Sequence, residues 1–188
     1  MTNQHDLNAQ LVDQFLIRDA LNRYARGVDR CQWDEVRAAF HPDATDDHGA
    51  YRGDVDGFIE WVSRRHALIE QSMHFLGNCI VDFADANTAL VETYFSAYQR
   101  LGPEAGESRL MLLGKASGDE SVDVTVLGRY VDRFEKRSNV WRIAKRITTF
   151  EAIRAGIVEN PARNPDYQWA QRNRTDSLYT MYESIFKQ

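Results

Sequence analysis

The chain has 188 residues, of which 43% are hydrophobic and 27% are charged, and its formal net charge is −5. A chain of this length can bury one substantial hydrophobic core but is short for two independent cores, so we expect a single domain. The basic residues form no block or stripe of the kind that binds phosphates, which argues against nucleic acid as a partner.

The distribution of apolar residues argues against a membrane protein. No apolar run reaches the roughly 20 residues that a bilayer-spanning helix needs, and the N-terminal sequence MTNQHDLNAQ lacks the basic and apolar segments of a secretory signal. We therefore expect a cytoplasmic protein that does not bind membranes. Cys31 and Cys79 are far apart and form no CxxC motif, so neither a disulfide framework nor a zinc site is expected.

The first 70 residues predict three helices. Apolar residues recur at intervals of three and four from about Asp6 to Arg30, which is the spacing of an amphipathic helix, and Gly27 indicates its end. Shorter helices are expected over residues 32–40 and 54–70, the second with Asp54 as its N-cap.

The sequence after Glu70 is rich in β-branched and aromatic residues, which predicts four strands. Their expected ranges are 72–83, 89–101, 122–134 and 139–149. A short polar strand and turn are expected at 45–53, between the second and third helices. The motif SRLMLL, at residues 108–113, is interpreted as an extension of a strand, and the rest of 102–121 as a flexible hairpin. Residues 155–188 predict an irregular tail with one terminal helix.

Helices followed by a run of strands predict an α+β fold. Side chains alternate between the two faces of a strand. One face of strand 72–83 therefore carries His74, Leu76, Asn78, Ile80 and Asp82, and the other carries Met73, Phe75, Cys79, Val81 and Phe83. Both faces include apolar residues, but three helices can cover only one face of the sheet. We therefore expect a homo-oligomer, a dimer or trimer, whose interface is the outer sheet face with residues such as Phe75 or Val81.

His74 is an unusual residue for an apolar strand, where an aliphatic side chain would leave no polar group to satisfy. A lone histidine in such a place is more often a core residue that donates to a backbone carbonyl. A functional interpretation needs a carboxylate that holds one ring nitrogen, so that the other nitrogen can take a proton.

The segment RYARGVDRCQWDEVRAAFHPDA, residues 23–44, places Tyr24, Asp29, Trp33 and Asp43 in the spacing Y-x4-D-x3-W-x9-D. This resembles the opening of the SnoaL-like group in the nuclear transport factor 2-like superfamily. The resemblance covers about residues 7–150 through the motifs SMHFLGN, DANTALVETYF and YVDRFEKRSNVWRIAKR.

The resemblance implies a fold and a division of the chain. The fold is a cone-shaped α+β barrel, in which three N-terminal helices wrap a curved mixed or antiparallel sheet around an apolar pocket. Residues 1–155 would form the SnoaL-like domain, and residues 156–188 a C-terminal extension that packs on the same domain.

Related proteins include scytalone dehydratase, bile-acid dehydratase and hexachlorocyclohexane dehydrochlorinase. By position, Asp29 and His74 match the Asp–His pair at the base of the family pocket, and Tyr24 matches a tyrosine of bile-acid dehydratases. The resemblance implies a cofactor-independent lyase or isomerase of the dehydratase type, acting on a small hydrophobic or polycyclic substrate. His74 would be the general base, Asp29 would orient it, and Tyr24 would be an acid or hydrogen-bond donor.

Each of these assignments has a structural alternative. Tyr24 is equally well explained as a core aromatic on the helix face, and Asp29 as an acid that accepts from backbone amides of the next turn. The chain also departs from the bile-acid enzymes, because the neutral segment FSAY, residues 95–98, replaces an acid, and Phe150 stands near the position of an arginine.

The remaining predictions concern ligands. The residues expected to bind substrate are Trp33, Phe58, Leu76, Asn78, Tyr94 and Arg129. No cofactor and no metal are expected, because Asp46, Asp47 and His48 alternate between strand faces and cannot all converge on one ion. The superfamily also contains proteins without catalytic activity. The alternative function is therefore a ligand-binding subunit, or a scaffold like the β subunit of ring-hydroxylating dioxygenases.

Overall fold

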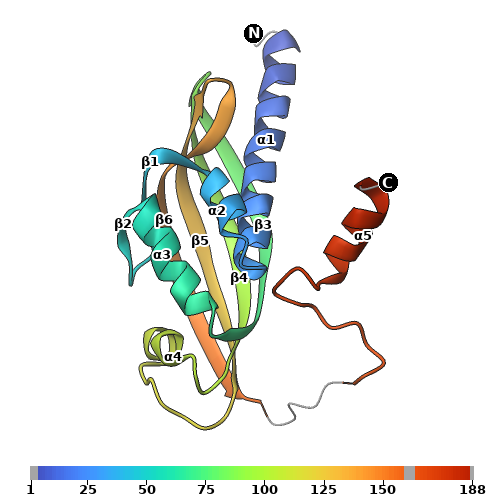
Figure 1. Ribbon diagram of the computed structural model, residues 1–188. Helices are drawn as coiled ribbons and strands as arrows, with labels where there is room; N and C mark the ends of the chain where they lie inside the picture. The colour runs from blue at the N-terminus through green and yellow to red at the C-terminus, as the bar shows by residue number, and fades with distance from the viewer. Residues whose placement is uncertain (1–3, 159–163, 187–188) are drawn as a thin grey trace.

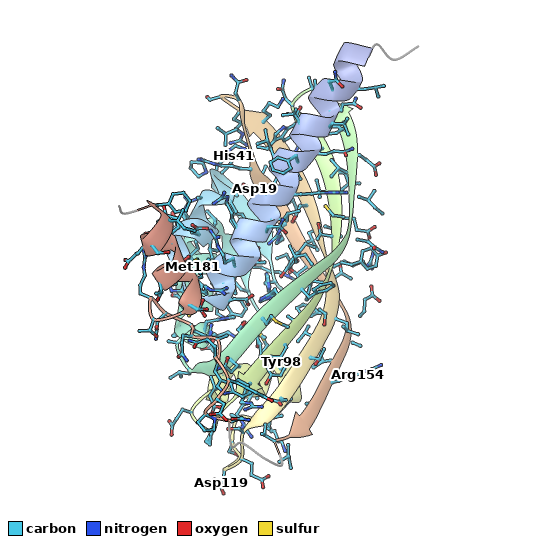
Figure 2. All side chains as sticks on the ribbon, turned by 90° about the vertical axis from the view of Figure 1, so that its right-hand side faces the viewer. Asp19, His41, Tyr98, Asp119, Arg154 and Met181 are labelled. Atoms are coloured by element: carbon cyan, nitrogen blue, oxygen red, sulfur yellow. The ribbon has the colours of Figure 1, made fainter. Side chains whose placement is uncertain are left out.

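A curved six-stranded sheet carries helices on its concave side (Figures 1 and 2). The computed structural model describes residues 4–158 and 164–186, so residues 159–163 of the predicted extension lie outside the described part. The sheet has the strand order β2-β1-β6-β5-β4-β3. Strands β1 and β6 are parallel, and every other neighbouring pair is antiparallel. The strands are β1 (Phe40–Asp47), β2 (Arg52–Asp54), β3 (Ile69–Asp85), β4 (Thr88–Leu101), β5 (Val122–Arg137) and β6 (Val140–Ile157).

Helices α1 (Gln4–Asp29), α2 (Trp33–Ala38) and α3 (Val55–His66) confirm the three helices expected from the sequence. The side chain of Asp54 accepts a hydrogen bond from the Gly57 amide at 2.8 Å, as expected of the N-cap of α3. The buried apolar positions of α1 recur every three or four residues and are Ile17, Leu21, Tyr24 and Val28. This stripe anchors α1 along the sheet.

Gly27 does not end α1, which continues to Asp29. A Cβ atom at Gly27 would lie 2.9 Å from a methyl carbon of Val36 in α2. The glycine therefore allows α1 and α2 to approach closely, and the prediction of a helix end at this residue is wrong.

A β-bulge in β3 changes which side chains face the helices. Leu76 pairs with Phe95 and Cys79 pairs with Thr93, so two residues of β3 oppose the single residue Tyr94. Beyond the bulge the inward-facing residues are Cys79, Val81 and Phe83, which pack against the core. The exposed residues of β3 include Asn78, Ile80 and Asp82. The strict alternation expected for this strand is therefore wrong beyond Leu76, and Val81 lies on the inner face.

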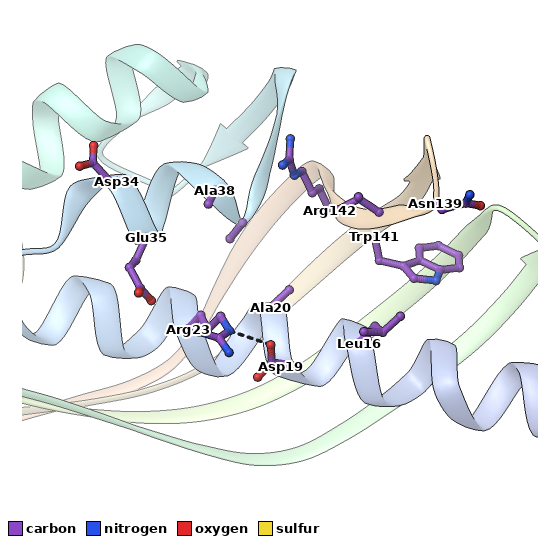
Figure 3. A pocket seen from close by; sticks show the side chains of 12 residues that line it. Leu16, Asp19, Ala20, Arg23, Asp34, Glu35, Ala38, Asn139, Trp141 and Arg142 are labelled. Atoms are coloured by element: carbon purple, nitrogen blue, oxygen red, sulfur yellow. Dashed lines mark hydrogen bonds and ion pairs between the residues drawn. The ribbon is translucent and has the colours of Figure 1, made fainter. Parts of the chain in front are cut away.

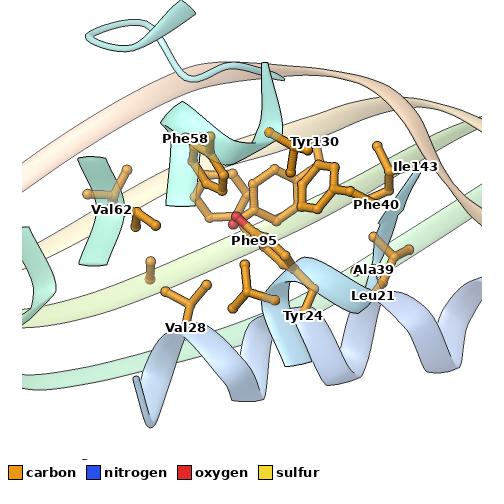
Figure 4. Close-up of a cluster of buried hydrophobic side chains, with 14 of the residues drawn as sticks. Leu21, Tyr24, Val28, Ala39, Phe40, Phe58, Val62, Phe95, Tyr130 and Ile143 are labelled. Atoms are coloured by element: carbon orange, nitrogen blue, oxygen red, sulfur yellow. The ribbon is translucent and has the colours of Figure 1, made fainter. Parts of the chain in front are cut away.

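Aromatic rings fill the space between α1, α3 and the sheet (Figure 4). Tyr24 meets Phe40 and Tyr130 edge to face, each at 5.8 Å between ring centroids. Phe95 stacks on Tyr130 at 4.5 Å. A Cβ atom at Gly128 would lie 2.7 Å from the Phe95 ring, so this position must lack a side chain for the stack to form.

A fully buried ion pair lies beneath this aromatic layer. Arg146 donates from Nε and Nη2 to the two carboxylate oxygens of Asp132, each at 2.7 Å, and neither side chain is exposed. The guanidinium also lies 4.3 Å from the ring centroid of Tyr24 and 4.0 Å from that of Tyr130. The bidentate geometry and the aromatic faces together compensate for the hydration that both charges lose on folding.

Two further helices lie later in the chain, one between β4 and β5 and one after β6. The motif SRLMLL belongs to α4 (Gly106–Leu113), so the prediction of a strand there is wrong. Gly114 ends α4 in the left-handed conformation at φ 71°. The expected terminal helix is α5 (Ser177–Phe186), which lies on the helical side of the sheet (Figure 2). None of the helices within the described ranges is both long and apolar enough to cross a membrane.

The buried pair predicts a large loss of stability when one partner is removed. Replacing Asp132 by Asn leaves the Arg146 charge buried without a counterion and should lower the free energy of unfolding by about 3–5 kcal/mol. Urea denaturation measures this change. Arg133→Gln is the control, because Arg133 is 60% exposed in its pair with Glu135 and should change the free energy by less than about 1 kcal/mol. Equal losses in the two variants would contradict this account.

Candidate active site

Asp29, the last residue of α1, is hydrogen-bonded to three groups of β3. Its Oδ1 lies 2.6 Å from Nδ1 of His74 and 2.9 Å from the Ser72 hydroxyl, which donates to it. Its Oδ2 accepts from the His74 backbone amide at 2.8 Å. The side chains of His74 and Asp29 are only 8% and 10% exposed. The contact between these two residues that the sequence predicts is therefore present.

The hydrogen bonds determine the protonation of the pair. Burial alone would raise the pKa of the Asp29 carboxyl, but the hydrogen bonds from the His74 ring, the His74 amide and Ser72 outweigh it and lower that pKa. An ionised carboxylate can only accept, so the His74 proton is on Nδ1. In the neutral ring, Nε2 then carries the lone pair that can take a proton from a substrate.

The backbone at the end of α1 is held by a distant arginine. Arg172 donates from Nε to the Asp29 carbonyl at 3.0 Å. Its Nη1 donates to the carbonyls of His66 at 2.7 Å and Ile69 at 2.5 Å. One guanidinium therefore satisfies backbone acceptors after α1 and α3 together, and it links the C-terminal segment to the base of the site.

A cavity of about 50 Å³ lies beside His74. Its apolar lining residues are Val28, Val62, Phe95, Ala97, Met111, Leu112, Val126 and Phe150. Its polar lining residues are Tyr24, His48, Arg65, His66, His74, Gln99 and Tyr130. Asp29 supports His74 from behind and does not itself line the cavity.

Tyr24 lines the same cavity as His74, as expected of a site residue. Burial raises the pKa of its hydroxyl above the ordinary value of 10.0, although the charge of Arg146 opposes this effect. Tyr24 is therefore a neutral hydrogen-bond donor over the physiological range and a poor proton donor.

His48 is a second histidine of the cavity that the sequence analysis did not include in the site. Its Nδ1 lies 3.0 Å from a carboxylate oxygen of buried Asp46 and 3.1 Å from the Thr148 hydroxyl. The signal that identifies this pair is the spacing i, i+2, which in extended backbone places both side chains on one side of the chain at the end of β1. Among the residues that the structure describes, no group of three or more His, Cys, Asp or Glu side chains could hold a metal ion.

The six residues expected to bind substrate do not line this cavity. Tyr94 and Arg129 lie on the outer face of the sheet, where the Arg129 guanidinium is 5.9 Å from the Tyr94 ring and pairs with Glu92 and Glu151. Asn78 is exposed, because the bulge in β3 turns it away from the helices.

The other three expected residues lie on the inner side but in other surroundings. Phe58 is fully buried and packs against Phe40 at 6.0 Å. Leu76 lines a separate cavity together with Arg18 and neighbouring residues. Trp33 packs edge to face against His66 at 6.1 Å. The residues that line the cavity come from α1, α3, α4, β3, β4, β5, β6 and the residue after β1, and their convergence depends on the tertiary fold.

A larger hollow is a groove of about 560 Å³ between α1, α2 and the turn that joins β5 to β6 (Figure 3). Leu16, Ala20 and Trp141 provide apolar surface, and Asp19 and Arg23 form an ion pair at 2.7 Å on its edge. This groove contains neither His74 nor His48. The volume of a hollow therefore does not identify the site in this protein. The two histidines favour the smaller cavity, because they can transfer protons.

The curved sheet, its covering helices and the Asp–His pair define a small α+β protein with the nuclear transport factor 2-like fold. A family model described as a SnoaL-like domain matches residues 9–147. The chain belongs to the SnoaL-like domain family, as the resemblance predicted. A search of curated proteins found no match.

Solved structures with similar folds include three from Novosphingobium species. A proposed scytalone dehydratase of Novosphingobium aromaticivorans has a TM-score of 0.64 at 17% identity, over 85% of this chain and 97% of the other. A hexachlorocyclohexane dehydrochlorinase, LinA type 3, of Novosphingobium barchaimii has a TM-score of 0.64 at 14% identity, over 84% of this chain and 97% of the other. A proposed aromatic ring hydroxylase of Novosphingobium aromaticivorans has a TM-score of 0.62 at 21% identity, over 79% of this chain and 94% of the other. Identities this low establish the fold alone.

His66 predicts a pH dependence of stability. Burial and the charges of Arg65 and Arg172 lower its pKa well below the ordinary value of 6.5. The unfolded chain therefore binds a proton that the folded chain does not, and stability falls as the pH drops below 6.5. The slope from this residue should approach about 1.4 kcal/mol per pH unit.

Urea denaturation between pH 5 and 8 tests this expectation with His66→Asn, which cannot titrate but keeps an oxygen acceptor for Arg172. The variant should lose less stability than the wild type below pH 6.5, and the two slopes should coincide above pH 7.5. Parallel slopes over the whole range would contradict the buried neutral state of His66.

Proposed function

We propose that this protein is a cofactor-independent lyase or isomerase of the dehydratase type that acts on a small, largely hydrophobic substrate. The observation that carries this proposal is the 2.6 Å contact between His74 and Asp29 at the wall of an aromatic cavity. Such a pair combines a base, a group that orients it and a charge that stabilises its protonated form.

In this mechanism Nε2 of His74 removes a proton from a substrate carbon. In an elimination, the electron pair of the broken C–H bond forms a double bond as a group leaves the neighbouring carbon with its bonding electrons, and the proton on Nε2 passes to a leaving hydroxide or, after a halide leaves, to water. In an isomerisation, Nε2 returns the proton to another carbon of the same substrate. The Asp29 carboxylate stabilises the imidazolium that forms. Tyr24, which lines the cavity, supplies a hydrogen bond to an oxygen or leaving group of the substrate. These steps use only side chains of this protein.

The cavity sets the scale of the substrate. A volume of about 50 Å³ accepts a group of a few heavy atoms. A polycyclic substrate would have to displace lining side chains such as Met111, Leu112 and Phe150. We therefore favour a small substrate over a polycyclic one.

Two observations from other proteins support this type of chemistry. Similar folds include one structure named as a scytalone dehydratase and another as a hexachlorocyclohexane dehydrochlorinase. Both names describe the removal of a small molecule from a substrate. A scaffold without activity is the alternative, and it predicts binding without turnover.

Substitution of the pair tests the proposal. His74→Ala and Asp29→Asn should each lower kcat on a substrate found by screening hydroxylated and halogenated hydrocarbons by about 10²–10⁴-fold, because general-base catalysis contributes that much. The control is Asp82→Asn, which changes an exposed carboxylate of the same strand. Thermal melts establish that each variant is folded. Full activity in a folded His74→Ala variant would contradict the assignment.

The outer sheet face supports the proposal that the protein is a homo-oligomer. This face carries exposed apolar side chains, of which Phe75 is 68% exposed and Met73 is 59% exposed. Ile80 and Tyr94 continue the exposed surface along β3 and β4. A contiguous apolar surface of this kind is typical of protein interfaces.

Light scattering tests the proposed assembly at micromolar concentration. The wild type should have the mass of a dimer or trimer, and Phe75→Lys should lower it. Phe15→Lys is a matched control, because Phe15 is 69% exposed on α1, away from the sheet face. A monomeric wild type, or an equal effect of the two substitutions, would exclude an interface on this face.

A further inference from the structure

Arg65 is a buried arginine that lines the His74 cavity and is only 5% exposed. Its Nε and Nη2 have no hydrogen-bond partner among residues 4–158 and 164–186. The guanidinium carbon lies 4.8 Å from the centroid of the Trp61 ring, which holds the side chain in place. Buried polar groups are normally hydrogen-bonded, so these two donors need an explanation.

The nearby charges do not neutralise Arg65. Glu107 raises its pKa, but this carboxylate is already bound by Arg64 through hydrogen bonds of 3.2 and 3.1 Å. Burial lowers the pKa of Arg65 to about 10, so the side chain remains charged at neutral pH. A charged group without a counterion is costly to bury, and it is retained where a ligand supplies the opposite charge.

The two unpaired atoms define the shape of that ligand. Nε and Nη2 form one edge of a guanidinium and can donate in parallel to two oxygens. The same edge of Arg146 holds both oxygens of Asp132 at 2.7 Å, and the same edge of Arg100 holds those of Asp123 at 2.8 and 3.0 Å. In both of these pairs, the Nε–Nη2 edge of the guanidinium binds the two oxygens of one carboxylate.

Neighbouring groups in the cavity are consistent with a polar head group at this end. The Nδ1 atom of His66 accepts from Arg172 at 2.9 Å, so the neutral ring carries its proton on Nε2. Gln99 also lines the cavity, and its side-chain NH2 group is a donor of the kind that an anionic head group needs. Elsewhere the cavity wall is apolar, because the stacked rings of Phe95 and Tyr130 form part of it and suit an apolar group of the ligand.

We propose that Arg65 binds the carboxylate of the substrate, so that the enzyme acts on small hydrophobic carboxylic acids rather than on uncharged hydrocarbons. This inference rests on the proposed function and deepens it, because it names the substrate class of the same cavity. Arg65 is a substrate-binding residue in this scheme, and His74 is the base that acts on the carbon chain of the bound acid.

Isothermal titration calorimetry tests the proposal with acids and their neutral amides of nearly equal shape. The pairs are acetate with acetamide, whose small size suits the cavity, and benzoate with benzamide. The wild type should bind at least one acid about tenfold more tightly than its amide. Arg65→Met should reduce this preference to less than twofold. Arg133→Met should preserve it, because Arg133 is 60% exposed and does not line the cavity. Arg65→Lys should retain part of the preference, because an ammonium lacks the two-donor edge.

Thermal stability distinguishes ligand binding from a structural role of Arg65. Removing a buried charge that has no partner should leave the Tm of the free protein unchanged or raise it. An Arg65→Met variant that melts lower or does not fold would overturn the proposal, as would equal binding of acid and amide by the wild type. His74→Ala should keep the acid preference. The test of carboxylate binding by Arg65 is therefore independent of the test of catalysis by His74.

Discussion

Asp29 connects, through its carboxylate and its backbone carbonyl, the three parts of the chain from which the site is built. The carboxylate accepts from the side chain and amide of His74 and from Ser72, and the carbonyl of the same residue accepts from Arg172. The end of α1, the start of β3 and the C-terminal segment therefore meet at one residue. A displacement of any of them would change the orientation of the His74 ring, and with it the direction in which Nε2 faces the cavity.

Three buried or partly buried arginines show how differently this fold treats a positive charge. Arg146 is paired with Asp132 between two tyrosine rings, and it supports the layer that contains Tyr24. Arg172 is bound mainly to backbone carbonyls, whose partial negative charge at helix ends favours a cation. Arg65 lacks either kind of partner for its Nε and Nη2 among the described residues. The first two contribute to structure, and the contrast is what makes the third a candidate for ligand binding.

Local patterns in the sequence predicted the helices and most strands, and the resemblance to the SnoaL-like family predicted the Asp29–His74 contact. These features depend on periodicity, on the N-cap at Asp54 and on a short motif whose spacing follows from the fold. The errors have physical causes. The bulge in β3 adds one residue to a strand without a sequence signal beyond Gly77, and it reverses the faces of Asn78 and Val81. The apolar motif SRLMLL fits a strand as well as a helix, and the tertiary contacts of this segment determine that it forms α4.

The cavity wall was harder to predict than the central pair. Met111 and Phe150 reach it from elements that are distant in sequence, and only the curvature of the folded sheet brings them to the same cavity as His74. Tyr94 and Arg129 are adjacent across β4 and β5, but on the outer face. A periodic pattern shows that two residues share a face but not which face meets the helices. That choice is made by packing of the whole sheet.

The position of Arg172 has a consequence for how the protein is made. The residue lies 143 positions after Asp29, so during synthesis the helices α1 and α3 leave the ribosome well before it does. Domains fold in the order in which they are translated, and contacts between distant segments form late. The nascent chain can thus form these helices while the carbonyls after α1 and α3 are still open to water. The active site would then mature as a last, separate step, at the moment when the C-terminal segment arrives and closes over those two helix ends.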